Sequence, residues 1–403
     1  MSSVASASGS LRSDAKVIGL IGIGHCLSHL SQFIIPSLFL FIKDDFGVSY
    51  SALGFSATLM FATAGLLQVP SGFLVDRFGG KPVLVCGLLM VTTGLVLAGL
   101  APGYWSFTAA MIFVGAGNSV FHPADFAILN ARIAVARIGH AFSVHGIGGM
   151  IGYASSAPLM LALASAFGWR SAAIGAGVVG ILFALLLASQ GELKGGGTTA
   201  KQSAATDEVA QGMRTLLTGP VLMCAGFFVL SSFSLISLQS FAVPVMVNVY
   251  GVSIAAASAA LSGYLVGSIA GMFGGGFIVS YKRFGVIAGS SIVISALVLL
   301  GVALSDFKAT GLLIAMLVAG FFVGLMNPSR DTIIRQIAPV KSRGKVYGFV
   351  YSGLDIGAAT GPLIAGWLID HGEPRMIFVA SAVALFLSAF TLMELSGKKA
   401  KPE

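Results

Sequence analysis

Twelve long apolar stretches account for most of the chain. Each contains about 20 residues or more, the length that an α-helix needs to cross the hydrocarbon core of a bilayer. They cover residues 17–42, 52–72, 83–101, 105–131, 140–166, 171–190, 219–249, 254–280, 286–305, 309–336, 344–369 and 375–395. We therefore expect an all-α membrane protein with twelve transmembrane helices.

Composition excludes an ordinary soluble protein. Hydrophobic residues make up 56% of the 403 residues and charged residues only 9%, whereas a soluble domain carries roughly a quarter charged residues. The first 16 residues are polar, and the apolar run that follows is about 26 residues long, which exceeds the core of a cleaved signal peptide. We expect this run to be the first helix of the mature protein.

The basic and cysteine residues do not indicate a nucleic acid or a metal. The net charge is +8, but Lys and Arg occur singly or in pairs between apolar runs rather than on one basic face. The three cysteines, Cys26, Cys86 and Cys224, all fall inside apolar stretches and have neither disulfide-framework nor zinc-site spacing. We expect no nucleic-acid partner, no disulfide, no metal and no cofactor.

One polar segment divides the chain into two sets of six helices. Residues 191–218 are rich in Gly and polar residues and have no apolar periodicity, as is typical of an exposed linker. The predicted organisation is a cytoplasmic tail, a six-helix bundle, a cytoplasmic linker, a second six-helix bundle and a cytoplasmic tail. Their bounds are 1–16, 17–190, 191–218, 219–395 and 396–403.

The distribution of Lys and Arg predicts the orientation. Positive residues are retained on the cytoplasmic side of membrane proteins. With the N-terminus inside, 18 of the 23 Lys and Arg residues are cytoplasmic, and Arg330 remains within a helix. We expect a multi-pass protein of the cell membrane, a bacterial inner membrane, with both termini cytoplasmic.

The two halves of the chain also repeat one another. HPADFAI at 122–128 aligns with NPSRDTI at 327–333, at an offset of 205 residues. At the same offset Gly139, Gly148, Gly152 and Arg170 align with Gly344, Gly353, Gly357 and Arg375. Such repeats are typical of transporters built from two duplicated bundles. The two bundles should therefore be pseudo-symmetric.

The segment GFLVDRFGGKP, residues 72–82, lies between the second and third expected helices. It resembles the signature loop of the major facilitator superfamily, and the family resemblance covers nearly the whole chain. The resemblance implies two six-helix bundles, alternating access, and a loop that latches them in one conformation. The matching latch residues are Gly72, Asp76, Arg77, Gly79 and Lys81. The alternative is a capped turn that carries inside-positive charge.

A narrower resemblance concerns the direction of transport. Ser28 with His29, and FHPAD at 121–125, are similar to motifs of the fosmidomycin-resistance group, which implies export. The chain departs from the drug and proton antiporter pattern at two places. Met111 stands where an arginine is usual, and GYASSAP at 152–158 replaces a Gly-Pro signature.

Polar residues recur on one face of several expected helices. In the fourth, Asn118, His122 and Asp125 stand at i, i+4 and i+7. In the family, helices 1, 4, 7 and 10 surround a central cavity. The residues expected to line it are His25, His29, Gln32, Asn118, Gln239, Asn327 and Arg330. The alternative is that these side chains only join helices. Cys26 points about 100° away from His25 on a helix, which disfavours a metal site.

An acidic residue and two imidazoles are expected at the same depth in the membrane. Asp125 lies seven residues inside Arg132, and His145 lies five residues inside His140. Imidazoles exchange protons near physiological pH, and intramembrane acids are functional by default. We expect proton coupling by Asp125, His122, His145 and Asp355. A purely structural cluster is the alternative.

Motifs for other functions are missing from the sequence. It contains no phosphate-cradling loop and no nucleophile and base motif, so neither an ATP-driven pump nor an enzyme is indicated. The leading hypothesis is a monomeric, proton-coupled secondary transporter that exports a small organic solute. Its partners are the solute, protons and the bilayer. The alternatives are proton-coupled uptake of an organic anion and a non-transporting membrane sensor.

Overall fold

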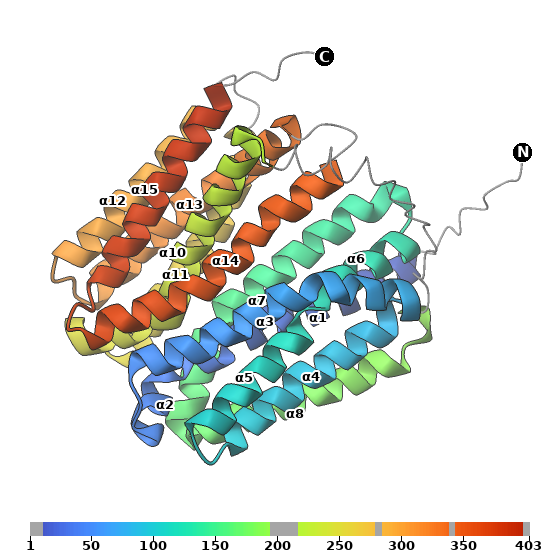
Figure 1. The fold of residues 1–403 in the computed structure, drawn as a ribbon, viewed down its shortest axis with the longest axis horizontal. Coiled ribbons are helices and arrows are strands. Elements are labelled where there is room, and N and C mark those ends of the chain that lie inside the picture. Colours follow the sequence, from blue (N-terminus) through green and yellow to red (C-terminus); the bar gives the residue numbers. More distant parts are fainter. Residues whose placement is uncertain (1–10, 194–216, 279–283, 338–342, 398–403) are drawn as a thin grey trace, which may run out of the picture. The chain divides into compact units, whose positions relative to one another are not determined.

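The computed structural model describes residues 11–193, 217–278, 284–337 and 343–397, and these ranges are helical with no strand (Figure 1). Eleven of the helical segments are long and apolar enough to cross a membrane. Helix α14 (Arg343–Asp370), with 28 residues, is a further long helix in the position of the expected span 344–369. The prediction of an all-α membrane protein is confirmed. The expected tails and the linker lie largely outside the described residues.

Contacts divide the chain into two units. The first comprises Met1–Leu38 and Leu59–Ala200, and the second Phe39–Thr58 and Lys201–Glu403. Helices of the first unit are α1 (Leu11–Ser37), α4 (Gly80–Leu100), α5 (Tyr104–Asn118), α6 (Phe121–Arg132), α7 (Ile138–Phe167) and α8 (Trp169–Ser189). Helices of the second are α2 (Phe39–Phe46), α10 (Gly219–Tyr250), α11 (Ile254–Ile278), α12 (Phe284–Leu304), α13 (Ala309–Ile337), α14 and α15 (Met376–Gly397). Helix α3 (Tyr50–Phe78) contributes to both.

The sequence repeat corresponds to the same helix pairs in each unit. In the first unit α1 packs against α7, and α4 against α8. In the second, α10 packs against α14, and α12 against α15. The repeat aligns α7 with α14, and the residues that follow align α8 with α15. Each unit therefore repeats the other's packing as well as part of its sequence.

Aligned glycines explain how closely these pairs approach. A Cβ on Gly148 of α7 would lie 2.5 Å from the carbonyl oxygen of Gly22 in α1. A Cβ on Gly353 of α14 would lie 2.6 Å from the carbonyl oxygen of Ala225 in α10. Both distances are shorter than real Cβ contacts, so any larger residue would push the helices apart.

Aligned arginines hold the ends of corresponding helices. In the first unit, Arg170 donates from Nη1 to the carbonyl oxygens of Gly99, at 3.1 Å, and Ala101, at 2.7 Å, at the end of α4. In the second, Arg375 donates to the carbonyl oxygen of Ala303 in α12 and forms an ion pair with Asp306. The hydrogen bond to Asp306 raises the pKa of Arg375. Both arginines thus satisfy carbonyls that a helix terminus leaves unpaired.

The fourth expected span differs from one continuous helix. It is broken at Ser119 and Val120, between α5 and α6. Pro123 lies in the first turn of α6 and has no N–H to donate to the carbonyl of Ser119, which accounts for the break. Asn118 and Asp125 therefore stand on successive helices rather than on one straight face.

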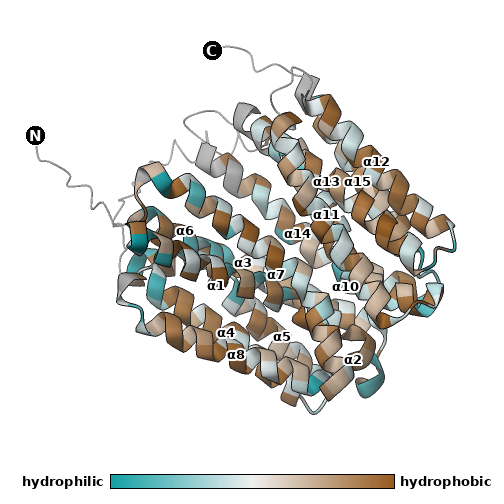
Figure 2. Ribbon diagram, turned by 180° about the vertical axis from the view of Figure 1, so that it is seen from behind, coloured by the Kyte–Doolittle hydropathy of each residue, from teal (hydrophilic) through white to brown (hydrophobic). Residues whose placement is uncertain are grey.

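Hydropathy along the helices fits a lipid environment. Figure 2 shows apolar residues along the length of α4, α8, α12 and α15, with hydrophilic residues concentrated near helix ends. Many exposed side chains are large and apolar, such as Trp105, Leu182 and Phe390. A surface of this kind is favourable in a bilayer and unfavourable in water.

Candidate functional site

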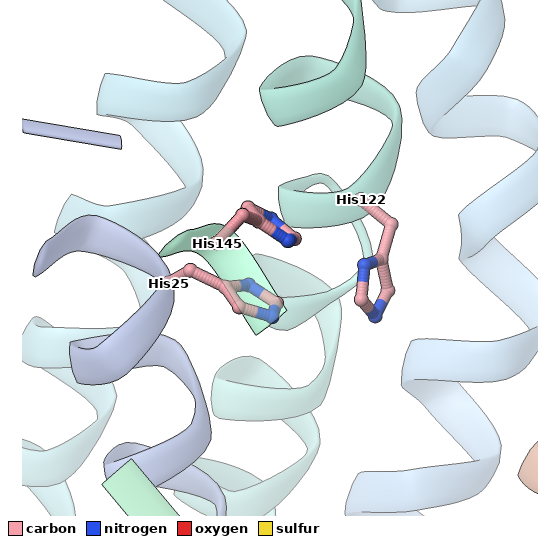
Figure 3. Close-up of side chains that lie close together, drawn as sticks. All are labelled: His25, His122 and His145. Atoms are coloured by element: carbon pink, nitrogen blue, oxygen red, sulfur yellow. The ribbon is translucent and has the colours of Figure 1, made fainter. Parts of the chain in front are cut away.

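Four histidines and one aspartate gather inside the first unit. We refer to His25, His29, His122, His145 and Asp125 as the imidazole cluster. His25 and His29 come from α1, His122 and Asp125 from α6, and His145 from α7. Figure 3 shows His25, His122 and His145 reaching from these three helices toward the same space. The structure therefore brings together residues that lie far apart in the chain.

Asp125 is the polar centre of the cluster. Its Oδ2 lies 3.0 Å from Nε2 of His145, a hydrogen-bond distance, and 3.5 Å from Nδ1 of His25. The rings of His25 and His145 are stacked, with centroids 3.6 Å apart and planes inclined by 18°. His25 also contacts His29 and His122, at centroid distances of 4.2 and 5.2 Å. One carboxylate thus faces two adjacent imidazoles.

Burial distinguishes the members of the cluster. Asp125 is 0% exposed, His25 3% and His145 5%. His29 is half-buried, whereas His122 is exposed. A buried carboxylate without hydrogen bonds or counter-charge is strongly unfavourable, so the bond to His145 stabilises Asp125 in its position. His122 is the member with the largest exposed fraction.

Local sequence explains why the rings fit together. A Cβ on Gly149 of α7 would lie 2.9 Å from Nε2 of His25 and 2.9 Å from Nδ1 of His29. Glycine at this position therefore leaves the space that both rings occupy. On α6, the break before Phe121 starts a new helix that carries His122 and Asp125 in its first two turns. The cluster depends on a small residue and on an interrupted helix.

A second set of polar side chains adjoins the cluster. Gln32 donates from Nε2 to Oδ1 of Asn118 at 3.3 Å, and its Oε1 accepts from the hydroxyl of Tyr153 at 3.1 Å. The ring of Tyr153 lies 4.2 Å from that of His29. Sequence reasoning missed Tyr153, although His145, Gly149 and Tyr153 stand at i, i+4 and i+8 on one face of α7.

Three nitrogen atoms of the cluster raise the question of a metal. His25, His122 and His145 each offer a ligand nitrogen, and these atoms lie within 4.8 Å of one another. Imidazole lone pairs lie in the ring plane, and zinc requires ligand nitrogens at about 2.0–2.1 Å. Two nearly parallel rings stacked 3.6 Å apart direct their lone pairs along parallel planes rather than to one point. In this arrangement His25 and His145 cannot both direct a lone pair to one ion unless a ring rotates.

The expected cavity residues of the second unit do not form a comparable cluster. Gln239 of α10 is buried and its Nε2 has no hydrogen-bond partner among the described residues. Arg330 of α13 donates to Oδ1 of Asn327 at 3.1 Å and lies over the ring of Phe228, 4.9 Å from its centre. Asp355 of α14 is half-buried and belongs to this unit, not to that of Asp125.

The expected latch loop divides into residues with different surroundings. Gly79, at a φ of 86°, makes the turn between α3 and α4. Lys81 donates from Nζ to the carbonyl oxygens of Ala188 and Gln190, at 2.6 and 2.7 Å. Asp76 and Arg77 are exposed, and the guanidinium of Arg77 lies 5.2 Å from the centre of the Phe78 ring.

Gly72 and Gly80 of this loop differ in their packing. Nothing within the described residues would contact a Cβ on Gly72, so close packing of the loop does not depend on it. Gly80, in contrast, lies close to α6, since its Cβ would lie 3.1 Å from the carbonyl oxygen of Ala124.

Sequence reasoning also missed an ion pair. Asp14 of α1 is buried, and its Oδ2 accepts from Nε of Arg137 at 2.7 Å and lies 2.6 Å from Nη2. Arg137 ends the 3-10 turn η1 (Val135–Arg137) before α7. No motif marks Asp14, because it stands alone at the polar start of the first helix.

Comparison with solved structures supports the fold. A bacterial homologue of the human lysosomal transporter Spinster, inward-facing and unoccupied, superposes with a TM-score of 0.83. The match covers 98% of this chain and 100% of that one, at 18% identity. The occupied form of a bacterial Spinster homologue matches with a TM-score of 0.79 at 17% identity. At such identities the likeness concerns the fold alone.

Curated relatives share more of the sequence. The multidrug resistance protein MdtH of Salmonella paratyphi B is 27% identical over 374 residues, covering 84% of this chain and 86% of the relative. The MdtH proteins of Salmonella newport and Salmonella enteritidis PT4 match to the same extent. The sequence profile of the Major Facilitator Superfamily matches residues 21–307 and 229–403. Because this profile matches nearly the whole sequence, the chain belongs to the Major Facilitator Superfamily of membrane transporters.

Proposed function

We propose that the protein is a proton-coupled exporter of small, partly hydrophobic organic compounds. The proton would bind between Asp125 and His145 in the imidazole cluster. The observation that carries this proposal is the 3.0 Å contact between Oδ2 of Asp125 and Nε2 of His145, inside helices long and apolar enough to span a membrane.

Charge counting explains why a proton is the expected ion. With Asp125 ionised and the four imidazoles neutral, the cluster carries one negative charge. Burying that charge in a membrane protein is unfavourable unless it is paired. One added proton, held by the carboxylate or by His145, makes the cluster neutral. Loading and release of this proton can therefore alternate with two conformations of the transporter.

The exposed imidazole of His122 supplies a path for the proton. His122 shares α6 with Asp125, and its ring centroid lies 5.2 Å from that of His25. A proton from water can reach His122 first and then the buried part of the cluster. In an exporter, proton entry from outside and release inside would drive the solute in the opposite direction.

The direction of transport rests on the relatives. The MdtH proteins are named as multidrug resistance proteins, which is consistent with export of chemically varied compounds. The narrower resemblance of Ser28, His29 and FHPAD to the fosmidomycin-resistance group favours the same direction. We therefore favour export over uptake of an organic anion.

Reconstituted protein tests the proposal. Wild type, Asp125→Asn and Asp355→Asn, which tests the other acidic candidate, would be incorporated into proteoliposomes with an imposed pH gradient. Ethidium serves as a cationic probe and pyranine as a proton indicator. We expect Asp125→Asn to lose gradient-driven ethidium movement and the accompanying proton flux, while passive exchange of ethidium continues.

Two results would contradict this proposal. Unchanged gradient-driven flux in Asp125→Asn would remove Asp125 from coupling, and loss in Asp355→Asn alone would transfer the role to α14. Accumulation of an organic anion such as benzoate, together with protons and in the absence of ethidium movement, would favour uptake instead.

A further inference from the structure

A groove opens beside the turn between α3 and α4, in the first unit. Its volume is about 830 Å³, and its lining includes Arg77, Phe78, Lys81, Val85, Cys86 and Leu89. It lies apart from the imidazole cluster, since none of the cluster residues lines it. The proposed transport mechanism makes no use of it.

The groove is cationic at one end and apolar along its length. Lys81, Val85 and Leu89 stand at i, i+4 and i+8, so they form a stripe along one face of α4. Eight residues of helix extend about 12 Å, which is comparable to much of one acyl chain in one leaflet. The stripe therefore leads from a charge at the end of the helix into its apolar part.

The positive end of the groove is partly fixed in place. Lys81 is held by the carbonyl oxygens of Ala188 and Gln190 at the end of α8. Arg77 is exposed over the ring of Phe78 and is available to an added anion. None of the lining residues that the structure describes is acidic. Asp76 is next to Arg77 in the chain but does not line the groove. The surroundings favour a negatively charged headgroup over a zwitterionic one.

We propose that this groove binds an anionic phospholipid of the cytoplasmic leaflet. The phosphate lies between Arg77 and Lys81, and one acyl chain follows Val85 and Leu89. The assignment of the leaflet follows from the distribution of Lys and Arg, which puts this loop on the cytoplasmic side. Binding here is independent of proton coupling, because it involves no residue of the imidazole cluster.

Cys86 provides a direct probe, because it lines the groove and is exposed, whereas Cys26 is half-buried and Cys224 buried. In a Cys26→Ser, Cys224→Ser background, the rate of maleimide labelling of Cys86 would be measured in detergent. Phosphatidylglycerol and phosphatidylcholine would be added separately. At about ten times the dissociation constant, we expect phosphatidylglycerol to slow labelling roughly tenfold, as mass action requires. Phosphatidylcholine should slow it much less.

Matched variants test the role of the charge. Arg77→Gln should remove most of the difference between the two lipids, and Arg12→Gln, which alters an exposed arginine of α1 outside the groove, should preserve it. Val85→Trp, which fills the apolar part, should abolish protection by phosphatidylglycerol.

Native mass spectrometry provides a measurement without labelling. In these spectra, the wild-type protein should retain phosphatidylglycerol in preference to phosphatidylcholine. Equal protection by both lipids, or equal loss of preference in Arg77→Gln and Arg12→Gln, would overturn the proposal.

Discussion

His145 and Asp125 are 20 residues apart in the chain, yet Nε2 of one lies 3.0 Å from Oδ2 of the other. The contact joins α7 to α6 at a point where both side chains are almost fully buried. The hydrogen bond makes the position of the carboxylate depend on that of the imidazole. Changes that move the ring should therefore act on the carboxylate as well.

Gly149 offers a way to move the rings without altering a polar group. In Gly149→Ala, the new Cβ would lie 2.9 Å from ring atoms of both His25 and His29. Imidazole rings can rotate away, so the fold should tolerate the change while the cluster is rearranged. We expect gradient-driven export to fall about tenfold or more, as is typical of a misplaced functional group.

The control is Gly146→Ala, on the same helix, where nothing described lies within 4 Å of the added Cβ. Both variants should have melting temperatures close to that of the wild type. Transport is measured in proteoliposomes as the initial rate at a fixed pH gradient. Equal rates in the two variants would show that the position of the rings does not matter.

His145 and His122 should differ in their effects. His145 bonds to Asp125, whereas His122 is exposed and its ring centroid lies 6.2 Å from that of His145. We expect His145→Gln to uncouple transport, so that solute moves without protons. His122→Gln should slow proton entry yet leave the ratio of protons to solute unchanged.

The ratio is obtained by measuring pyranine and ethidium signals in the same vesicles. A changed ratio in His122→Gln, or an unchanged ratio in His145→Gln, would contradict the assigned roles. If both variants only slow transport, the imidazoles serve to support structure.

Much of the fold could be predicted because apolar length and charge placement are local properties of the sequence. The helices were predictable from runs of about 20 apolar residues. The proximity of Asp125 and His145 was predictable from equal depth on successive helices, counted from Arg132 and His140. Depth counting works because the rise per residue of a helix is constant.

Other features depend on tertiary contacts and were not predictable in this way. The break at Ser119 leaves Asn118 on a different helix from His122, so periodicity alone misjudges their shared face. His25 joins the carboxylate because glycines let α1 approach α7, which no pattern within α1 reveals. Asp14 pairs with Arg137 across 123 residues, and neither belongs to a recognisable motif.

Asp14 and Asp76 should respond differently to neutralisation. Asp14 is buried in an ion pair, and removing its charge leaves Arg137 without that partner. Asp14→Ala, which removes the acceptor oxygens together with the charge, should reduce the free energy of unfolding by about 2 kcal/mol, as expected for a hydrogen bond to a charged group. Asp76 is exposed, so Asp76→Asn should leave thermal stability unchanged.

Turnover then separates the two explanations of the loop at 72–82. If Asp76 acts in a latch, Asp76→Asn should slow transport with little effect on solute binding, because the residue must change contacts between conformations. Normal turnover at normal stability would make the loop a capped turn. The measurements are thermal unfolding in detergent, solute binding, and transport in proteoliposomes.

Asp370 joins the end of α14 to the start of α3 within the second unit. Its Oδ1 accepts from the backbone N–H of Tyr50 at 3.0 Å, and its Oδ2 from that of Ser51 at 2.7 Å. The first N–H groups of a helix have no partner within the helix, and a carboxylate there is further favoured by the helix dipole. Asp370 therefore acts as an N-terminal cap supplied from another helix, and it orders the beginning of α3.

Neutralising or removing this cap should have graded effects. Asp370→Asn keeps one acceptor oxygen and should lose less stability than Asp370→Ala, for which a loss of about 1 kcal/mol is typical of a helix cap. Asp44→Asn, an exposed acid at the end of α2, is the control for charge alone and should have no effect. Hydrogen exchange of Tyr50 and Ser51 should accelerate in Asp370→Ala, because their N–H groups lose their acceptor. Unchanged exchange in that variant would mean that water or another group satisfies the start of α3, and that the cap does not hold the two helices together.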